Sequence, residues 1–138
     1  MESPYAGRVS PRERVEAYGT AGEKQLARMF HHHGIDYFYE HPVAVVDRGK
    51  TRVWYPDLWL PECAVAIDYA GMAHDLDYAK GMARRQQVYR ENGIPYVVVR
   101  PEDLKGNWAK RILGRIEDEL ALRLQQFHGR AMGDTGRP

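Results

Sequence analysis

The sequence contains little of what marks a disulfide scaffold, a membrane protein or a nucleic-acid coat protein. Cys63 is the only cysteine among 138 residues, which excludes an internal disulfide framework and any CxxC metal site. No apolar run reaches the length of a membrane span, and the N-terminal residues lack the hydrophobic segment of a signal peptide. Because the net charge is only +1, binding to a polyanion must depend on a local surface. We therefore expect a cytoplasmic protein without membrane contacts.

Several common enzyme motifs are also absent. The chain has no P-loop, no glycine-rich dinucleotide turn, no GxSxG elbow and no HxE with CxxC pair of a zinc deaminase. Its 43% hydrophobic and 28% charged residues are ordinary for a globular chain, and its length favours one domain with a substantial core. We predict a single domain over residues 1–138, with frayed ends at 1–9 and 129–138.

Hydrophobic periodicity predicts an α/β protein. Helix-capping patterns begin at Ser10–Glu13 and Thr20–Glu23, and the second of them starts a helix over 20–33. The predicted strands are 35–47, 51–60, 64–70 and 94–101, and the further predicted helices are 75–91 and 107–127. Short turns favour an antiparallel meander of the first three strands, and a helical crossover makes the fourth strand parallel. The expected fold is a mixed four-stranded sheet flanked by helices, plus a C-terminal helix.

Two aspartates belong to consecutive apolar strands, where a carboxylate is costly to desolvate unless it is paired or binds a cation. Alternation along strand 64–70 puts Asp68 on a face that otherwise carries alanines, which leaves space beside it. Asp57 follows Pro56 in the neighbouring strand. The two acids favour a hard divalent cation such as Mg²⁺ or Mn²⁺, with a carbonyl near Tyr69 as a further ligand. Such a cation activates water for phosphodiester hydrolysis.

The residues “YPDLWL” and “AIDYA” resemble the PD-(D/E)xK nuclease superfamily, and the element order over about 20–100 is similar to its αβββαβ core. The resemblance implies a metal-dependent endonuclease acting on DNA. It makes Asp57 the motif aspartate, Asp68 the second metal-binding acid and Glu23 a further acid that helps to hold the metal. The stretch “LPECAVAID” followed by His74 is also similar to the very-short-patch-repair branch, in which a histidine follows the third strand.

The chain departs from the superfamily motif at Ala70, where the motif has a lysine. Some members place this cation on the following helix, so the phase of helix 75–91 matters. At 100° per residue Arg85 falls within an inward stripe of Tyr78, Met82 and Tyr89. A guanidinium there is expensive unless it meets carboxylates or phosphate. The segment from Arg85 to Tyr89 also resembles the Lys/Gln-x-x-x-Tyr pattern of several branches. We predict that Arg85 takes over the electrostatic part of the lysine's function.

Structural interpretations stand beside these functional ones. Glu23 is also the third residue of a helix, where a capping-box glutamate belongs. Asp68 and Arg85 are equally consistent with an inert salt bridge, and Asp57 with a turn-initiating residue. His74 is either a helix cap or an active-site base.

The same helix carries three further cations, Lys80, Arg84 and Arg90, on or near its solvent side. They are either a solvated face or contacts to nucleic-acid phosphates.

Three functions are consistent with these residues. The first is a Mg²⁺-dependent endonuclease for DNA. The second, favoured by Ala70, is a catalytically silent member of the fold that binds nucleic acid or a protein. The third is an unrelated small α/β binding module in which both aspartates are structural. The sequence leaves a homodimer open.

Overall fold

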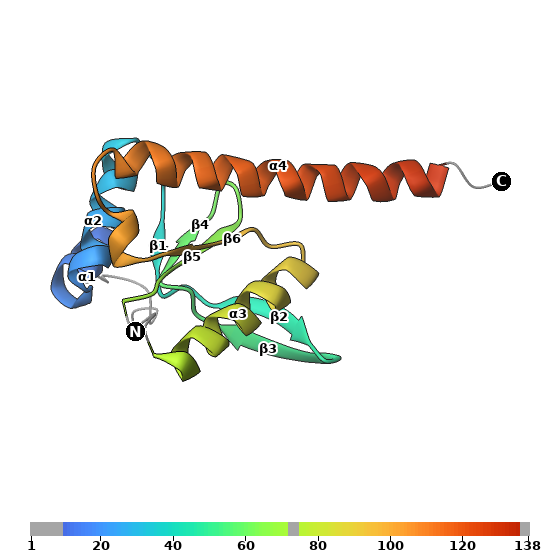
Figure 1. The fold of residues 1–138 in the computed structure, drawn as a ribbon, viewed down its shortest axis with the longest axis horizontal. Coiled ribbons are helices and arrows are strands. Elements are labelled where there is room, and N and C mark those ends of the chain that lie inside the picture. Colours follow the sequence, from blue (N-terminus) through green and yellow to red (C-terminus); the bar gives the residue numbers. More distant parts are fainter. Residues whose placement is uncertain (1–9, 72–74, 136–138) are drawn as a thin grey trace, which may run out of the picture.

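The structure, a computed structural model, describes residues 10–71 and 75–135, with side chains up to residue 127. Helices and strands follow one another as α1 (Pro11–Tyr18), α2 (Ala21–His32), β1 (Phe38–Tyr39), β2 (Val43–Asp47), β3 (Lys50–Trp54), β4 (Leu58–Leu60), β5 (Val65–Tyr69), α3 (Leu76–Glu91), β6 (Tyr96–Val99), a 3₁₀ turn (Pro101–Asp103) and α4 (Trp108–Thr135). Figure 1 shows the small central sheet, with α1 and α2 at one end, α4 along one side and α3 on the other.

The sheet is four-stranded and mixed, as predicted. Its strand order is β1-β4-β5-β6. The pairs β1–β4 and β4–β5 are antiparallel, whereas β5 and β6 are parallel, with Asp68 opposite Val98. Because α3 lies between β5 and β6 in the chain, the helical crossover to a parallel fourth strand is confirmed.

The boundaries of the first two predicted strands are wrong. Each is interrupted near a proline, so that 35–47 divides into β1 and β2, and 51–60 into β3 and β4. Pro42 and Pro56 supply no N–H to a ladder, and Glu40 adopts a positive φ of 54° that bends the chain away from the sheet. As a result β2 and β3 form a separate antiparallel ribbon, while β1 and β4 stay in the sheet.

The two faces of the sheet carry separate cores. The predicted alternation in β5 is confirmed, since Val65 and Ile67 belong to one core and Ala66 and Ala70 to the other. The first core is covered by α1, α2 and α4. Side chains of α3 and of the β2–β3 ribbon complete the second, and Asp68 faces the second core fully buried. The predicted packing of the first long helix and of the crossover helix against the sheet is therefore confirmed.

Helix α4 packs on the sheet through its first half only. Ile112 and Ile116 are buried in the first core, and Leu120 packs at its margin. Further along, Leu124 is 68% exposed, because the second half of the helix runs past the sheet (Figure 1). Within the described residues no helix is long and apolar enough to cross a membrane.

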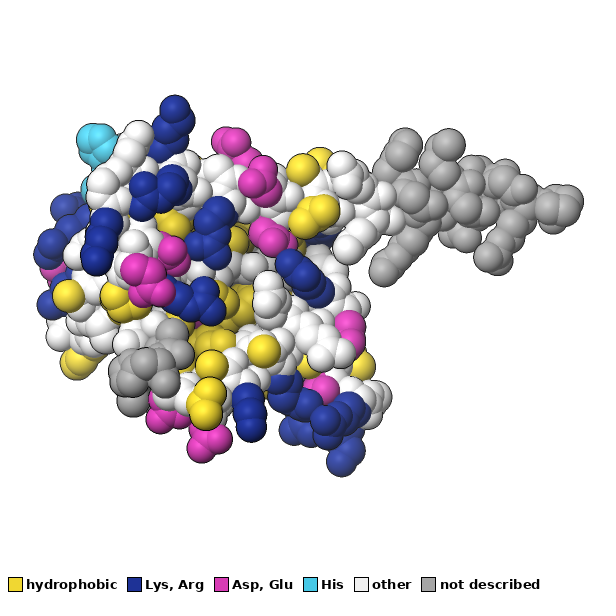
Figure 2. Space-filling model, viewed as in Figure 1, with side chains coloured by type: hydrophobic (Ala, Val, Ile, Leu, Met, Phe, Trp, Pro, Cys, Tyr) yellow, Lys and Arg dark blue, Asp and Glu magenta, His cyan; other side chains and the backbone are white. Residues whose placement is uncertain are grey.

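A hollow separates α3 from α4 on the side of the molecule seen in Figure 2. Its floor is β6, with Met82 from α3 and Arg115 from α4 among its walls. Arg115 Nη2 donates to the carbonyl of Val98 at 2.7 Å. This bond occupies one of the main-chain groups that β6 exposes at the edge of the sheet.

The N-terminus of α2 touches β5 at Gly22. A Cβ atom built at this position would lie 2.1 Å from the ring of Tyr69, whereas one at Gly81 in α3 would meet nothing within 4 Å. We expect Gly22→Ala to lower the free energy of unfolding by about 1–3 kcal/mol, because the ring of Tyr69 must move. Gly81→Ala, the matched control, should raise it by about 0.5–1 kcal/mol. Urea unfolding measures both, and a stabilising Gly22→Ala would contradict this contact.

Candidate functional site

Asp57 and Asp68 meet at the β4–β5 pair, where each carboxylate accepts a main-chain N–H from the neighbouring strand segment. The N–H of Asp57 donates to Asp68 Oδ1 at 2.9 Å, and the N–H of Tyr69 donates to Asp57 Oδ2 at 2.7 Å. The register pairs Leu58 with Ile67, so the next step of the ladder places the two aspartates opposite each other. The carboxylates therefore lie on the same side of the sheet, which the predicted shared site requires.

Arg85 reaches Asp68 from the inner face of α3, in agreement with the helix phase read from the sequence. Its Nη1 donates to Asp68 Oδ2 at 2.6 Å, and the hydroxyl of Tyr96 donates to the same oxygen at 2.6 Å. With the N–H of Asp57, three donors satisfy a carboxylate that has no exposed surface. Such short charge-assisted bonds hold the side chain in one orientation.

The guanidinium of Arg85 is held between Asp68 and an aromatic ring. Its Cζ lies 5.8 Å from the ring centroid of Trp54, within the range of a cation–π contact. Burial acts to lower the pKa of Arg85, but Asp68 and Tyr96 outweigh it and leave the pKa above its ordinary value. Arg85 is therefore a permanent cation in the site.

Asp57 titrates far above the ordinary range of an aspartate. Burial, followed by the negative charge of Asp68, raises the pKa of Asp57 to about 7 from an ordinary 3.8. The hydrogen bond from the Tyr69 N–H and the charge of Arg85 oppose this rise, and Glu23 adds to it. Among the described residues no donor reaches the second carboxylate oxygen, Oδ1. The pKa of Asp57 is therefore close to neutral pH, and one of its carboxylate oxygens can accept a cation, a water or a proton.

Glu23 lies at the margin of this site but serves as a helix cap. Its Oε1 accepts from the Thr20 hydroxyl at 3.0 Å and from the Thr20 N–H at 3.3 Å, which completes a capping box. The capping interpretation is confirmed. Over residues 10–71 and 75–127 the structure assembles no group of three or more His, Cys, Asp or Glu side chains arranged to hold a metal. The carboxylate pair is therefore present without the third predicted ligand beside it.

The other predicted site residues have different outcomes. The Tyr69 carbonyl, predicted as a metal ligand, accepts a long hydrogen bond of 3.5 Å from the Tyr78 hydroxyl. Ala70 is 1% exposed and packs in the second core, so the position of the motif lysine is closed to solvent. His74 lies outside the described residues.

Arg84 lies on the solvent side of α3, as predicted, with 43% of its side chain exposed, but it also has a carboxylate partner. Its Nη2 donates to Asp47 Oδ2 in the β2–β3 ribbon. The ribbon folds over α3 because the two prolines release it from the sheet, which the sequence prediction did not include. Arg90 lies 3.5 Å from Glu119 of α4, and Lys80 is exposed. Two of the three cations therefore already have carboxylate partners.

Sequence reasoning missed several residues of the site. Tyr96 was predicted only as part of a buried strand, yet it donates to Asp68 and lies opposite Ala66 in the parallel pair. Trp54 reaches Arg85 from the ribbon. The hydroxyl of Tyr89 is buried without a hydrogen-bond partner within the described part of the chain. The available signal was the presence of tyrosines in two neighbouring elements, α3 and β6, beside the Asp68–Arg85 pair. Only the strand register shows that Tyr96 is the tyrosine that reaches Asp68.

Negative charges outnumber positive charges around Asp57 and Asp68. Asp57, Asp68 and Glu23 supply three carboxyl groups, and among the described residues Arg85 is the cation in hydrogen-bond contact with them. Burial and neighbouring acids raise the pKa of a carboxyl group. An added cation lowers that pKa again and so returns the group to its ionised form. Within the described residues Asp57 keeps one carboxylate oxygen for an added cation, whereas both oxygens of Asp68 already accept hydrogen bonds.

Comparisons with known proteins give no family assignment. No family model matches the chain, and neither the curated proteins nor the solved structures contain a significant match. The functional argument therefore depends on the residues and geometry of the site.

Proposed function

We propose that the protein is a divalent-metal-dependent endonuclease that hydrolyses phosphodiester bonds in DNA, and that it belongs to the PD-(D/E)xK superfamily. The observation that carries the proposal is that Asp57 and Asp68 lie opposite each other across β4 and β5, with Arg85 of α3 bound to Asp68. The mixed sheet with a parallel strand after a helical crossover supports it, because this is the arrangement that the resemblance implies.

Each residue has a role in this proposal. Asp57 and Asp68 would hold Mg²⁺ or Mn²⁺. The cation would polarise the phosphate and lower the pKa of a bound water. Without the cation Asp57, with a pKa of about 7, is partly protonated at neutral pH, and the bound cation would return it to its ionised form. Arg85 offsets negative charge that develops on the phosphate. Since arginine cannot accept a proton, the activation of water falls to the acids and the bound cation.

A second function is a catalytically impaired member of the same fold that binds nucleic acid or a protein. Two observations favour it. Arg85 already forms a 2.6 Å ion pair with Asp68, and Ala70 leaves no room for a solvated lysine. In this alternative the site is a buried salt bridge that contributes to the specificity of the fold.

Plasmid nicking distinguishes the two functions. Supercoiled plasmid should be converted to nicked and linear forms by the wild-type protein in Mg²⁺ or Mn²⁺, and should stay intact in EDTA. Conversion that is equal with and without the cation would contradict metal dependence. No conversion in any divalent cation, together with retained DNA binding, would select the impaired alternative. A location in the cytoplasm and a homodimer stay predictions.

A further inference from the structure

We propose that the β2–β3 ribbon is a DNA-binding element that enters the major groove of duplex DNA and holds the flanking phosphates with Arg48, Lys50 and Arg52. The inference rests on the proposed function and extends it. It names duplex DNA as the partner and assigns binding to a surface outside the Asp57–Asp68 site.

The tip of the ribbon is strongly basic although the whole chain is nearly neutral. Arg48 lies in the turn, Lys50 and Arg52 follow it in β3, and Arg84 of α3 lies beside them. Figure 2 shows Lys and Arg side chains gathered over this end of the molecule. Asp47 is the acid within residues 47–52, and it is only 3% exposed. Four cations against one buried carboxylate create the local positive surface that the net charge of the chain conceals.

The buried carboxylate orients the arginines. Asp47 Oδ2 pairs with Arg52 Nε at 3.2 Å and also accepts from Arg84 Nη2. The register sets Asp47 opposite Lys50, and Val45 opposite Arg52, so these side chains share the face of the ribbon that looks toward α3. Arginine held in this way keeps further donors for a phosphate.

The turn carries an arginine where another residue would fit better. Arg48 has a φ of 53° and Gly49 a φ of 75°, which is the left-handed pair of a two-residue type I′ hairpin. Asparagine, aspartate and glycine are preferred at the first position, and other side chains cost about 1 kcal/mol there. A long cation at the tip despite this cost indicates a function for its charge.

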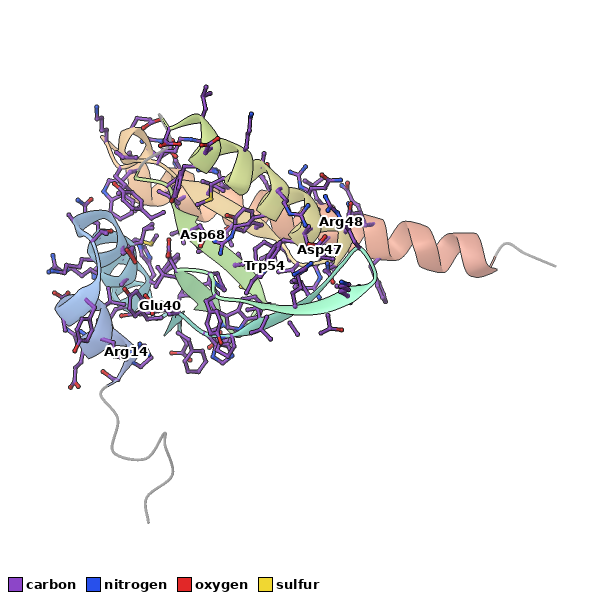
Figure 3. The ribbon with its side chains drawn as sticks, turned by 90° about the horizontal axis from the view of Figure 1, so that it is seen from below. Arg14, Glu40, Asp47, Arg48, Trp54 and Asp68 are labelled. Atoms are coloured by element: carbon purple, nitrogen blue, oxygen red, sulfur yellow. The ribbon has the colours of Figure 1, made fainter. Side chains whose placement is uncertain are left out.

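The ribbon is fixed relative to the Asp57–Asp68 site. The side chain of Asn92, at the end of α3, accepts from the N–H of Val46 at 2.8 Å and donates to its carbonyl at 3.0 Å. At the other end Trp54 lies edge-on to Tyr89, with ring centroids 5.3 Å apart, and contacts Arg85. Figure 3 shows Asp68, Trp54, Asp47 and Arg48 following one another from the site to the tip.

The length and width of the β2–β3 ribbon suit binding to duplex DNA. Four strand steps from Val43 to Asp47 cover about 13 Å at ~3.3 Å per residue, which corresponds to about four nucleotides of one DNA strand. A two-stranded ribbon fits the major groove of B-form DNA. The major groove of A-form RNA is too narrow for side chains to enter, so duplex RNA is expected to bind more weakly.

Fluorescence anisotropy of a labelled 20-base-pair DNA duplex tests the proposal, with Arg48→Asn/Lys50→Gln compared with the wild-type protein. The variant should bind at least about tenfold more weakly at low salt, and the slope of log K against log salt should fall by about 2. Its melting temperature should not fall, because Asn-Gly is the preferred type I′ turn. The matched control, Lys105→Gln/Lys110→Gln, removes the same charge from exposed positions before and in α4 and should change affinity less than twofold.

The outcomes separate this inference from the proposed function. Equal weakening by both double variants, or unchanged binding by the ribbon variant, would overturn the ribbon even if the wild type nicks plasmid. Ribbon-dependent DNA binding without metal-dependent nicking would support the ribbon and remove the nuclease. Binding to vesicles containing phosphatidylserine in place of DNA, or equal binding to duplex RNA, would also overturn the inference.

Discussion

Asp57→Asn should abolish divalent-dependent cleavage, with a loss of about 10²–10⁴ in rate, while the protein stays folded. The amide keeps an oxygen for the Tyr69 N–H, whose bond to Asp57 Oδ2 is 2.7 Å long in the wild type. It cannot bind a cation as a carboxylate does or take up a proton. Time courses of plasmid nicking in Mg²⁺ measure the loss. Asp36→Asn, a change of the same kind at an exposed position, is the control and should retain activity.

The same substitution should change how stability depends on pH. The pKa of Asp57 is about 7 in the folded protein and 3.8 is its ordinary value, so the folded state binds more protons between these limits. The stability contributed by the protonated group is complete below pH 4 and is lost as the pH rises through 7. We expect the wild type to lose about 2–4 kcal/mol over this range.

Urea unfolding at several pH values measures this loss, and Asp57→Asn should show a flatter profile and greater stability at pH 8. Mg²⁺ should stabilise the wild type more at pH 8 than at pH 5, because protons compete with the cation for Asp57, and should not stabilise the variant. Identical pH profiles for the two proteins would show that Asp57 titrates normally in the fold.

Arg85→Ala should reduce cleavage by about 10²–10³, far more than Lys80→Ala. Arg85 is half-buried against Asp68 and Trp54, whereas Lys80 is exposed and acts through solvent. Single-turnover nicking rates at saturating protein separate this effect from weaker DNA binding. Equal losses in the two variants would mean that α3 supplies only a diffuse basic field, and the impaired, binding-only function would then be preferred.

Two further variants guard against a loss of structure. Arg85→Ala leaves the fully buried Asp68 without its cation, which costs about 3–5 kcal/mol in comparable buried pairs. Arg85→Lys keeps the charge and should recover most of the activity if the function is electrostatic.

Ala70→Lys restores the superfamily residue, and because Ala70 is 1% exposed the new ammonium must reach the acids to be tolerated. In an active enzyme the lysine should raise a weak nuclease activity. In a binding-only protein it should lower the free energy of unfolding without creating activity.

Much of the site follows from local periodicity. Alternation in β5 places Asp68 with the alanines, and the phase of α3 directs Arg85 inward, and both predictions hold because strands and helices have fixed repeats. Glu23 shows the limit of this reasoning, since its spacing from Thr20 satisfied a cap equally well. Periodicity states which face a residue takes, but not which partner it meets there.

Sequence by itself determined the α/β class, the order of the main elements, the pairing of Asp57 with Asp68 across one turn and the inward arginine. Only the tertiary structure decided that Pro42 and Pro56 release the β2–β3 ribbon, that Asp47 pairs with Arg52 and Arg84, and that Tyr96 donates to Asp68. The physical reason is that the first group depends on contacts close in sequence with a regular repeat. The second depends on strand register and on the packing of the ribbon against α3, which join residues as far as 46 positions apart.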